Sequence, residues 1–465
     1  MKVLHISAEC FPIAKVGGLA DVVGALPKYQ NNLKTTSSVV MPFYNNKFTK
    51  QHTFTEIYKN TIALGHQYFQ FNILKLVDSS LGFELYCVDI KELLFTEKVY
   101  TNDDTDRFLA FQIAVLDWIL SGHEYPDVLH VHEYHTGLIP FMVSRCYKYK
   151  PLSNIPTVLT IHNAQYQGWF SHDKVNLLPP FNFKDVGLLD WDNTVNPLAA
   201  AIKCAWRVTT VSPSYMIELK QNANGLENLL LHESAKCVGI LNGIDTAVWN
   251  PETDKRLLKN YSSTTVISGK KEHKKWLCNK FNLDIKKPLY TFIGRLVGEK
   301  GADLFAEIFK EALSHKDISI LLLGSGNPDS EKEITSIKDP NFNTYIGYNE
   351  DLAHKIYAGS DFLLMPSRVE PCGLNQMYAL RYGTVPIVNA IGGLKDTVID
   401  IDNNGFGLLH NGVTTANVNR AIRRASEFYS ETKKFRSNLK TIMAIDNSWN
   451  NSGKTYVNLY KSLKK

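Results

Sequence analysis

The sequence predicts an α/β protein made of two Rossmann-like domains that face one another across a cleft. Its 465 residues exceed the roughly 250–300 over which one hydrophobic core keeps growing, so two domains are expected. Short β-rich apolar runs alternate with longer amphipathic stretches along almost the whole chain, a pattern typical of parallel sheets covered by helices on both faces. Such sheets bind ligands beyond the carboxyl ends of their strands, so we expect the functional residues at strand ends.

Both halves of the chain contain these apolar runs. In the first half the predicted strands are KVLHISAE, SSVVMPFY, FELYCVDI, DVLHVHE, PTVLTIH, RVTTVS and GILNGI. In the second half they are PLYTFIGR, ISILLLG, NTYIGY, DFLLMPS and TVPIVNA. Each half is therefore expected to form its own sheet.

A polar stretch, WNPETDKRLLKNYSSTT, separates the two sets of strands and has the Pro, Ser, Thr and charge content of a linker. We place the domain boundary near residue 249, which gives a first domain over 1–248 and a second over 249–447. The last segment, 448–465, is predicted to be a helix. Its periodicity leaves open whether it caps the second domain or crosses back to the first.

The composition is that of an ordinary globular protein, with 44% hydrophobic and 21% charged residues. No stretch approaches the roughly 20 apolar residues of a membrane-spanning helix, so no membrane partner is expected. The formal charge of +5 is spread over scattered Lys and Arg residues, which does not favour a nucleic-acid partner. The seven cysteines lack metal-ligand spacing and are expected to be reduced thiols. Because the first residues alternate like a strand and not like an export signal, we expect a cytoplasmic protein.

A pair of glycines follows the first predicted strand, in AKVGGLADVVGALP. Gly17 and Gly18 open a predicted helix, where backbone N–H groups can approach an anionic ligand. Lys15 lies just before them and can place a positive charge on a phosphate group. The alternative is a plain glycine-permitted turn with a surface lysine.

A second group of basic residues occurs in FIGRLVGEKGADL. Arg295 ends a predicted strand and Lys300 precedes the next helix, with Gly298 and Gly301 shaping the turn between them. Both cations can converge on one diphosphate, whose growing charge would be stabilised by several kcal/mol in a closed cleft. Ordinary surface charge is the alternative interpretation.

A carboxylate follows the strand DFLLMPS in the segment PSRVEPCGLNQMYALRYGTVP. Glu370 can accept hydrogen bonds from sugar hydroxyls, while Gly373 leaves backbone amides open to a ligand. The alternative is a carboxylate that merely favours the start of a helix. Cys372, between them, is expected to be a packed side chain because no histidine lies in its immediate sequence.

Histidines end two further predicted strands. His162 ends PTVLTIH, and LHVHEYHTG contains His130, His132 and Glu133. This H-x-H-E string is similar to a metal-ligand cluster. On a strand, however, the two histidines share one face and Glu133 lies on the other, so a single site would require a bend. We therefore assign no metal.

Taken together, these segments resemble the bacterial glycogen synthase and plant starch synthase family, which has the twin-Rossmann (GT-B) glycosyltransferase fold. The matching segments follow the family's order over nearly the whole chain: KVGGLADVVGALP, TIHNAQYQG, TTVSPSY, GILNGID with WNPETD, GRLVGEKG, LLGSGNP, PSRVEPCGLNQMYALRYGTVPIV and GGLKDTV. The resemblance implies a retaining hexosyltransferase that moves glucose from ADP-glucose or UDP-glucose onto the non-reducing end of an α-1,4-glucan such as glycogen. It implies no cofactor and no metal ion, an acceptor-binding and catalytic first domain, and a second domain that binds the nucleotide sugar.

The resemblance also implies roles for individual residues. The implied catalytic residues are Lys15, His162, Arg295, Lys300 and Glu370. The implied donor-binding residues are Lys15, Gly18, Asn242, Arg295, Lys300, Tyr348, Glu370, Cys372 and Gly373. The residues implied to bind the acceptor or its sugar are Asp21, Glu133, Tyr134 and Asn163. Among the donor-binding residues, the basic side chains would hold the phosphates and Tyr348 would stack on the base.

No residue in these motifs is identified as the nucleophile that a retaining glycosidase uses, where two carboxylates lie about 5–5.5 Å apart. We therefore expect attack on the face from which the diphosphate leaves, with the leaving diphosphate receiving the acceptor's proton. Arg295, Lys300 and Lys15 would stabilise its growing charge. Closure of the two domains is expected to exclude water from the site.

Several positions depart from the family pattern. Val16 stands where Thr is usual, and Glu133 and Tyr134 stand where Asp-Trp is usual. Asn375 and Ile391 both replace Thr; the amide can still donate to a phosphate, whereas the isoleucine cannot. The loop FTEKVYTNDDTD is shorter than usual. These departures bear on acceptor preference and turnover and not on the fold.

Three other functions are compatible with parts of the pattern. An enzyme of the same fold could use another acceptor, such as sucrose, trehalose or a cell-wall glycan. A glucan-binding pseudoenzyme could keep the fold without turnover, although the retention of all five implied catalytic residues argues against it. A nicotinamide oxidoreductase would need the G-x-G-x-x-G fingerprint, which is absent after the first strand.

Overall fold

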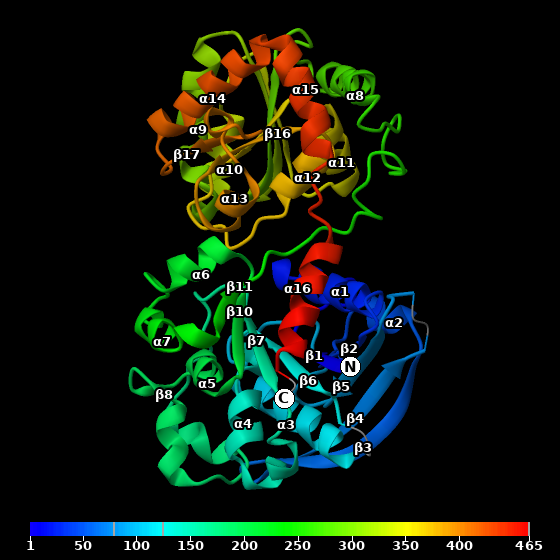
Figure 1. Cartoon of the computed structure of the whole chain (residues 1–465), viewed down its shortest axis with the longest axis vertical. Helices are drawn as coiled ribbons and strands as arrows, with labels where there is room; N and C mark the ends of the chain where they lie inside the picture. Colours follow the sequence, from blue (N-terminus) through cyan, green and yellow to red (C-terminus); the bar gives the residue numbers. More distant parts are fainter. Residues whose placement is uncertain (78–79, 123–124, 464–465) are drawn as a thin grey trace. The chain divides into compact units, whose positions relative to one another are not determined.

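The computed structural model describes residues 1–77, 80–122 and 125–463. The chain forms two compact units (Figure 1): the first contains Met1–Asn242 and Trp449–Lys465, and the second contains Gly243–Ser448. Each unit has a sheet with helices packed against it, as the sequence predicts. Within the described ranges, no helix combines the length and the apolar character needed to cross a bilayer.

The first unit is built on a nine-stranded sheet in the order β11-β10-β7-β6-β1-β2-β5-β4-β3. Its strands are β1 Lys2–Ile6, β2 Thr36–Pro42, β3 Phe54–Leu64, β4 Gln67–Leu76, β5 Glu84–Asp89, β6 Val128–His132, β7 Thr157–Ile161, β10 Arg207–Thr210 and β11 Cys237–Gly239. A separate two-stranded sheet contains β8 Asp190–Trp191 and β9 Thr194–Val195. The helices of this unit are α1 Gly18–Asn31, α2 Lys47–Gln51, α3 Thr105–Ser121, α4 Ile139–Arg145, α5 Pro197–Cys204, α6 Pro213–Leu219, α7 Glu227–His232 and α16 Trp449–Lys461.

The central strands β1, β6 and β7 pair in parallel and end at one edge of the sheet. Every residue of β6 and of β7 is buried. Parallel strands covered on both faces are buried along their whole length, so these strands carry apolar residues on both faces, and their polar residues, such as His130 and Thr160, are buried with them. The edge they share is where the polar motifs begin.

The sequence did not predict the antiparallel hairpin of β3 and β4 at the far edge of this sheet. Its strands expose much of their length, so their polar residues hide the alternation that marks a strand. The two strands are joined at Gly65, whose φ of +61° lies in the left-handed region that favours glycine. The predicted strand GILNGI was also displaced, because β11 is Cys237–Gly239.

The second unit has a six-stranded parallel sheet in the order β14-β13-β12-β15-β16-β17. Its strands are β12 Leu289–Leu296, β13 Ser319–Gly326, β14 Phe342–Ile346, β15 Phe362–Met365, β16 Val385–Asn389 and β17 Leu408–His410. Its helices are α8 Val266–Phe281, α9 Phe305–Ser314, α10 Pro328–Thr335, α11 Glu350–Gly359, α12 Asn375–Arg381, α13 Gly392–Thr397, α14 Thr415–Ser430 and α15 Thr432–Met443. The sequence did not predict β17, which has only three residues.

The two faces of the second sheet pack against different helices. Leu321 and Leu323 of β13 belong to an apolar cluster that includes residues of α8 and α11. The alternate residues Ile320 and Leu322 belong to another cluster, which includes residues of α9 and α14. Both sets of side chains are therefore apolar, and the strand shows no polar face.

The polar stretch expected to be a linker is folded onto the second unit, and the chain divides after Asn242 instead of near residue 249. The Trp249 ring stacks between those of His354 and Tyr378, with centroids 4.0 and 3.8 Å away. The buried Asp254 carboxylate accepts a hydrogen bond of 2.7 Å from the Tyr382 hydroxyl and lies 2.7 Å from His354 Nδ1. Residues of this stretch thus have buried partners elsewhere in the second unit.

The C-terminal helix α16 belongs to the first unit, where it lies beside α1 (Figure 1). Residues 464 and 465 of the predicted 448–465 segment lie outside the described residues. Trp449, Tyr456 and Tyr460 are buried and join Val3 of β1 and Leu26 of α1 in one apolar cluster. This helix therefore completes the core around the central strands.

We expect Trp449→Ala to lower the free energy of unfolding of the first unit by about 3–5 kcal/mol, because it removes a buried indole from this cluster. The neighbouring Asn450 is exposed, and Asn450→Ala should change that free energy by less than about 0.5 kcal/mol. Chemical denaturation of both variants checks this. Equal losses in the two variants would contradict the packing of α16 described here.

Candidate functional site

The glycine segment after β1 leads into the 14-residue helix α1. Gly17 is the residue before the helix, and no side chain caps the helix start. Apart from chain neighbours and the backbone of the helix itself, a Cβ atom added to Gly17 or Gly18 would meet no atom of the described residues within 4 Å. Packing within the protein therefore does not require glycine at either position. The open space beside these amides can instead admit a ligand, and helix N–H groups favour an anion there.

A buried carboxylate fixes the position of this segment. Glu9 Oε2 accepts hydrogen bonds from the backbone N–H groups of Val16, at 2.5 Å, and Gly17, at 2.9 Å. Its other oxygen accepts one of 2.5 Å from the Tyr100 hydroxyl. Two of the loop amides are thus used by the protein itself, and those of Gly18 onward belong to the uncapped start of α1. Sequence reasoning did not single out Glu9 or Tyr100, although Glu9 is the last residue of a predicted strand.

Lys15 and Asp21, predicted to bind phosphate and sugar, form an ion pair in which Nζ lies 2.7 Å from Oδ1. The side chains are 47% and 28% exposed. Pairs in such exposed positions contribute about 0–1 kcal/mol. A phosphate group carries more charge than a carboxylate and can therefore displace Asp21 from Lys15 at little cost.

Glu133, at the end of β6, has its side chain turned onto the end of β7. Its Oε1 accepts hydrogen bonds from the backbone N–H groups of His162, at 2.5 Å, and Asn163, at 2.7 Å. Glu133 has a φ of +65°, which is unusual for a residue other than glycine. Its Oε2 is buried without a hydrogen-bond partner among the described residues. Burial raises the pKa of this carboxyl group to about 8, against the opposing effect of the two N–H donors.

His162 begins the loop after β7, and its Nε2 lies 3.1 Å from Nδ1 of His132. Burial lowers the pKa of His162 to about 3, so its imidazole is neutral at neutral pH. The Asn163 side chain accepts a hydrogen bond from Gln165 N at 3.0 Å. Asn242 is buried near the end of the first unit, and its Oδ1 has no hydrogen-bond partner in the described part of the chain.

Tyr134 lines a cavity of about 270 Å³ in the first unit. The loop 101–105 forms part of its wall, so the loop singled out for its shortness borders Tyr134. Gly168, with a φ of +69°, is required here, because a Cβ atom would lie 2.1 Å from the Tyr134 ring. The aromatic residues around this cavity are Phe108, Tyr134, Trp169 and Phe170.

In the second unit, Lys300 and Glu370 are paired directly, with Nζ 2.5 Å from Oε2. The Ser367 hydroxyl donates to the same oxygen at 2.8 Å. Their side chains are only 21% and 11% exposed, so this pair is more shielded from water than an ordinary surface pair. Arg295, on β12, extends into solvent with 70% of its side chain exposed, and its guanidinium lies 3.5 Å from Glu299.

The backbone around Glu370 is packed tightly against the start of α13. Gly393 N donates to Glu370 O at 3.2 Å. A Cβ atom on Gly392, which has a φ of +41°, would lie 2.1 Å from Glu370 O, and one on Gly393 would lie 2.2 Å from Cys372 O. Gly373 also has a positive φ, of +71°. The glycines thus fix the main chain that carries Glu370, and Cys372 is buried within it.

The positions that depart from the family pattern have structural partners. Asn375 uses one of its amide hydrogens to bond Ile293 O at 2.8 Å. Ile391 is partly buried and packs against the core of the second unit, which accounts for an apolar residue there. Tyr348, expected to stack on a base, is 84% exposed, and its hydroxyl lies 3.4 Å from Glu350 Oε2.

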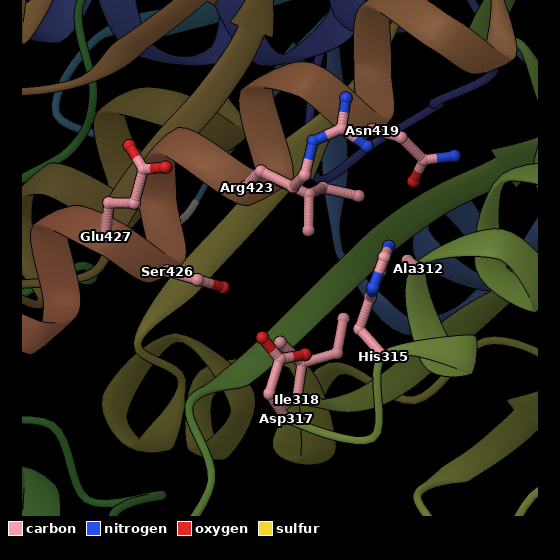
Figure 2. Close-up of a pocket in the computed structure, with 9 residues that line it drawn as sticks. Ala312, His315, Asp317, Ile318, Asn419, Arg423, Ser426 and Glu427 are labelled. Carbon is pink, nitrogen blue, oxygen red and sulfur yellow. The ribbon is translucent and has the colours of Figure 1, made fainter.

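A larger hollow, of about 360 Å³, lies elsewhere on the second unit and contains none of the predicted site residues. Figure 2 shows Asn419 and Arg423 of α14 on one side of it and His315 with Asp317 on the other. The predicted site is therefore defined by its polar contacts and not by this hollow.

The structure brings together Lys15 with Asp21, Glu133 with His162 and Asn163, and Lys300 with Glu370. It adds four partners that the sequence did not reveal: Glu9, Tyr100, Ser367 and His132 as a neighbour of His162. Only the position of Glu9 at the end of a predicted strand could have indicated it. The others depend on contacts between segments far apart in the sequence.

Comparison with known families gives two matches. Residues 2–232 match the family described as starch synthase catalytic domain. Residues 274–441 match the family described as glycosyl transferases group 1. Together these matches cover most of both units.

Known proteins resemble the chain over its full length. A glycogen synthase of Flavobacterium johnsoniae is 50% identical over 99% of this chain and 98% of its own length. A glycogen synthase of Streptococcus sanguinis is 37% identical, and both chains are covered completely. The catalytic domain of starch synthase IV from Arabidopsis thaliana, solved bound to ADP and acarbose, matches with a TM-score of 0.87 and 30% identity over 99% of both chains. A sucrose-phosphate synthase of Thermosynechococcus elongatus shares the fold, with a TM-score of 0.64 at 15% identity over 99% of this chain and 98% of its own.

These likenesses confirm the predicted fold class, an α/β protein with two Rossmann-like domains of the GT-B type. They also confirm the resemblance drawn from the sequence motifs.

The raised pKa of Glu133 predicts a pH-dependent stability. The pKa of this carboxyl group rises from its ordinary 4.5 to about 8 in the folded protein, so between these pH values the unfolded chain releases a proton that the folded chain keeps. The stability contributed by this group is therefore lost as pH rises from about 4.5 to 8.

Glu133→Gln keeps an oxygen for the two N–H donors and removes the titration. We expect urea unfolding to show a gain of about 3 kcal/mol for this variant over the native protein between pH 5.5 and 8.5, at about 1.4 kcal/mol per pH unit up to pH 8. A constant difference between the two proteins at both pH values would show that Glu133 is ionised throughout.

Proposed function

This chain belongs to the family of glycogen synthases and starch synthases and is a glycosyltransferase, and from that premise we propose that it elongates an α-1,4-glucan. It transfers glucose, with retention, from ADP-glucose or UDP-glucose to the 4-hydroxyl at the non-reducing end. The single observation that carries this proposal in the structure is the shielded Lys300–Glu370 pair. It places a cation for phosphate beside a carboxylate for sugar hydroxyls. The ADP bound to the related starch synthase supports a nucleoside diphosphate as the leaving group.

The donor diphosphate is bound by residues of both units. Lys15 and Gly18 of the first unit bind the diphosphate. The open space at the glycines and the uncapped start of the helix support this role. Arg295 and Lys300 of the second unit bind the diphosphate too. The high exposure of Arg295 leaves its guanidinium accessible to a ligand. Tyr348, which is also exposed, stacks on the base; because stacking tolerates either kind of base, both donors fit this role.

The transferred glucose is held mainly by Glu370, whose carboxylate is oriented by Lys300 and Ser367. Cys372 and Gly373 lie against the sugar and phosphate in this proposal. His162, Asn163 and Asn242 serve the same sugar from the first unit. The unpartnered Oδ1 of Asn242 supports its role, because a buried amide oxygen gains from a ligand hydroxyl.

The acceptor glucan lies near Asp21, Glu133 and Tyr134 in this proposal. The aromatic residues around the cavity beside Tyr134 support it, because their rings offer apolar surface to a sugar. Glu133 does not act as a nucleophile, since one oxygen is occupied by two backbone donors and its raised pKa keeps it protonated at neutral pH. Binding is its function here.

The reaction proceeds by attack on the face from which the diphosphate leaves. The bond between the glucose C1 and the phosphate oxygen breaks, the bond from C1 to the acceptor's 4-oxygen forms, and the hydroxyl proton passes to the leaving phosphate. Lys15, Arg295 and Lys300 stabilise the charge that develops on that phosphate. We propose a cytoplasmic setting for this reaction, as the sequence predicts.

Two other functions remain as outcomes of the same assay. A glycosyltransferase with another acceptor would release nucleoside diphosphate only when a different acceptor, such as a small sugar, is added in place of glycogen. A glucan-binding pseudoenzyme would bind glycogen without turnover. The decisive experiment incubates purified protein with glycogen and either ADP-glucose or UDP-glucose, and measures both diphosphate release and glucose incorporated.

Lys300→Ala is expected to lower kcat in this assay by about 10²–10³-fold, because it removes a cation from the developing diphosphate. Lys310→Ala, at an exposed position on α9, should leave kcat unchanged. Near-ultraviolet circular dichroism checks that both variants are folded. A folded Lys300→Ala enzyme with native kcat would remove Lys300 from the mechanism.

We also propose that no metal ion takes part, since lysine and arginine supply the charge that a metal would otherwise provide. Exhaustive dialysis against EDTA should therefore leave the transfer rate unchanged, and added Mg²⁺ should not raise it. A rate that collapses after dialysis and returns with a divalent cation would overturn this proposal.

A further inference from the structure

A continuous series of hydrogen bonds leads from His162 into the interior of the first unit and on to the C-terminal helix. We call it the histidine chain; its members, in order, are His162, His132, His5, Gln30, Tyr460, His130, Thr160 and Thr209. Its last member donates to the backbone oxygen of Leu159 at 3.1 Å. Every member except His162 is fully buried. None of the members beyond His162 has a role in the function proposed above.

The direction of these hydrogen bonds is set at the inner end, because the Leu159 carbonyl can only accept. Thr209 donates to it, so the Thr209 oxygen accepts from Thr160, 2.6 Å away. The hydroxyl of Thr160 is then used as a donor. It must accept from His130 Nε2, which lies 2.6 Å away and therefore carries a hydrogen.

The direction of the next hydrogen bonds, which involve Tyr460 of the C-terminal helix, follows from the state of His130. A neutral His130 with hydrogen on Nε2 has an accepting Nδ1, so the Tyr460 hydroxyl, 2.7 Å away, donates to it. Tyr460 then accepts from the amide nitrogen of Gln30 at 3.1 Å. This fixes the orientation of the Gln30 amide and turns its oxygen toward His5. The Ser37 hydroxyl donates to that oxygen at 2.7 Å, consistent with this orientation.

The direction of the remaining three hydrogen bonds, between Gln30 and His162, follows in the same way. His5 donates from Nε2 to the Gln30 oxygen at 2.8 Å, so its Nδ1 accepts from His132 Nε2 at 3.1 Å. The Nδ1 of His132 must then accept from His162 Nε2 at 3.1 Å. His162 therefore carries its hydrogen on Nε2, and its Nδ1 has a lone pair.

These hydrogen-bond directions hold for neutral histidines, and burial keeps the histidines neutral. It lowers the pKa of His5 to about 4 and holds the pKa values of His130 and His132 well below their usual range. The rings of His130 and His132 stack with centroids 4.2 Å apart, a spacing that two imidazolium cations would oppose.

His5, His130 and His132 also have nitrogens within 4.8 Å of one another, close enough to bind one metal ion. However, both ring nitrogens of each histidine already have a hydrogen-bond partner within the chain. An ion would have to break several of these buried bonds. The geometry favours hydrogen bonding over metal binding.

We propose that the histidine chain holds His162 in the tautomer with hydrogen on Nε2, so that its Nδ1 accepts a hydrogen bond from a sugar hydroxyl. The inner members are positioning residues: His132, His5, Gln30, Tyr460 and His130. The sugar as ligand rests on the proposed function, whereas the tautomer rests on the hydrogen bonds alone. The consequence is that the C-terminal helix, through the Tyr460 hydroxyl, sets the state of a side chain in the functional site.

The direction of the hydrogen bonds between Gln30 and His162 depends on the Tyr460 hydroxyl, because the Gln30 amide can adopt either of two orientations. Without that hydroxyl, the Gln30 amide can turn over and present nitrogen to His5. Each bond from His5 to His162 can then reverse, which places the hydrogen of His162 on Nδ1. Tyr460→Phe should therefore give a mixture of the two tautomers.

The test is ¹⁵N NMR of the full-length protein labelled at histidine, with His162 assigned by its loss in a His162→Asn variant. In the native protein we expect a protonated Nε2 and an unprotonated Nδ1, and in Tyr460→Phe we expect averaged shifts for both nitrogens. The matched control is Tyr456→Phe, a buried tyrosine of the same helix that is outside the histidine chain, which should keep the native pattern. Hydrogen on Nδ1 in the native protein, or an unchanged pattern in Tyr460→Phe, would overturn the proposal.

Transfer kinetics give a second readout. Tyr460→Phe should lower kcat by about three- to tenfold, the effect of one hydrogen bond, whereas Tyr456→Phe should stay within about twofold. The two proposals fail separately. Absence of glucosyl transfer in the native protein would remove the proposed function and leave the NMR result standing, while transfer accompanied by the other tautomer would remove this inference alone.

Discussion

Hydrogen bonds that backbone N–H groups donate to two buried carboxyl groups hold the loops at the strand ends of the first unit in place, and the candidate site depends on them. Glu133 fixes the start of the loop after β7 through the N–H groups of His162 and Asn163. Glu9 does the same for the glycine segment through Val16 and Gly17. Loops at strand ends have few regular partners of their own, and an unpaired buried N–H costs free energy. A carboxyl oxygen can satisfy two such groups at once and so fix a loop that no sheet or helix would hold.

The interior behind these loops is polar but uncharged. The histidine chain fills the space between the central strands and α16 with neutral rings, an amide and hydroxyl groups, each bonded to the next. Charged groups in that position would need partners to offset the loss of water. Neutral groups need only hydrogen bonds, and these have a direction that can be traced to one carbonyl oxygen. The first unit therefore keeps the charges of its site, such as Lys15 and Asp21, near the solvent.

The sequence predicts those parts of the fold that short stretches of neighbouring residues encode. The runs DVLHVHE and PTVLTIH predict buried strands because they are short and rich in β-branched and other apolar residues, and the residues that end them lie at the site because the carboxyl ends of parallel strands share one edge. The hairpin of β3 and β4 was missed because its exposed strands lack that pattern. The polar stretch after Trp249 looked like a linker because its buried partners, such as His354, are about a hundred residues away. The pairing of His5 with His132 depends in the same way on the register between strands 127 residues apart. No local pattern encodes such a contact.

The two ion pairs of the candidate site differ in a way that separates their tasks. Lys15 and Asp21 are both substantially exposed, so water already competes for each charge and an arriving phosphate can take over Lys15. Lys300 and Glu370 are shielded, and Ser367 adds a second hydrogen bond to the same carboxylate oxygen. Separating them would leave a charge poorly hydrated, which costs more than the pair contributes. In the function proposed above, a ligand would therefore bind around this pair without splitting it, with anionic groups toward the lysine and hydroxyl groups toward the remaining oxygen of Glu370. The shielded pair would then orient the proposed donor, whereas Asp21 of the exposed pair would be displaced from Lys15.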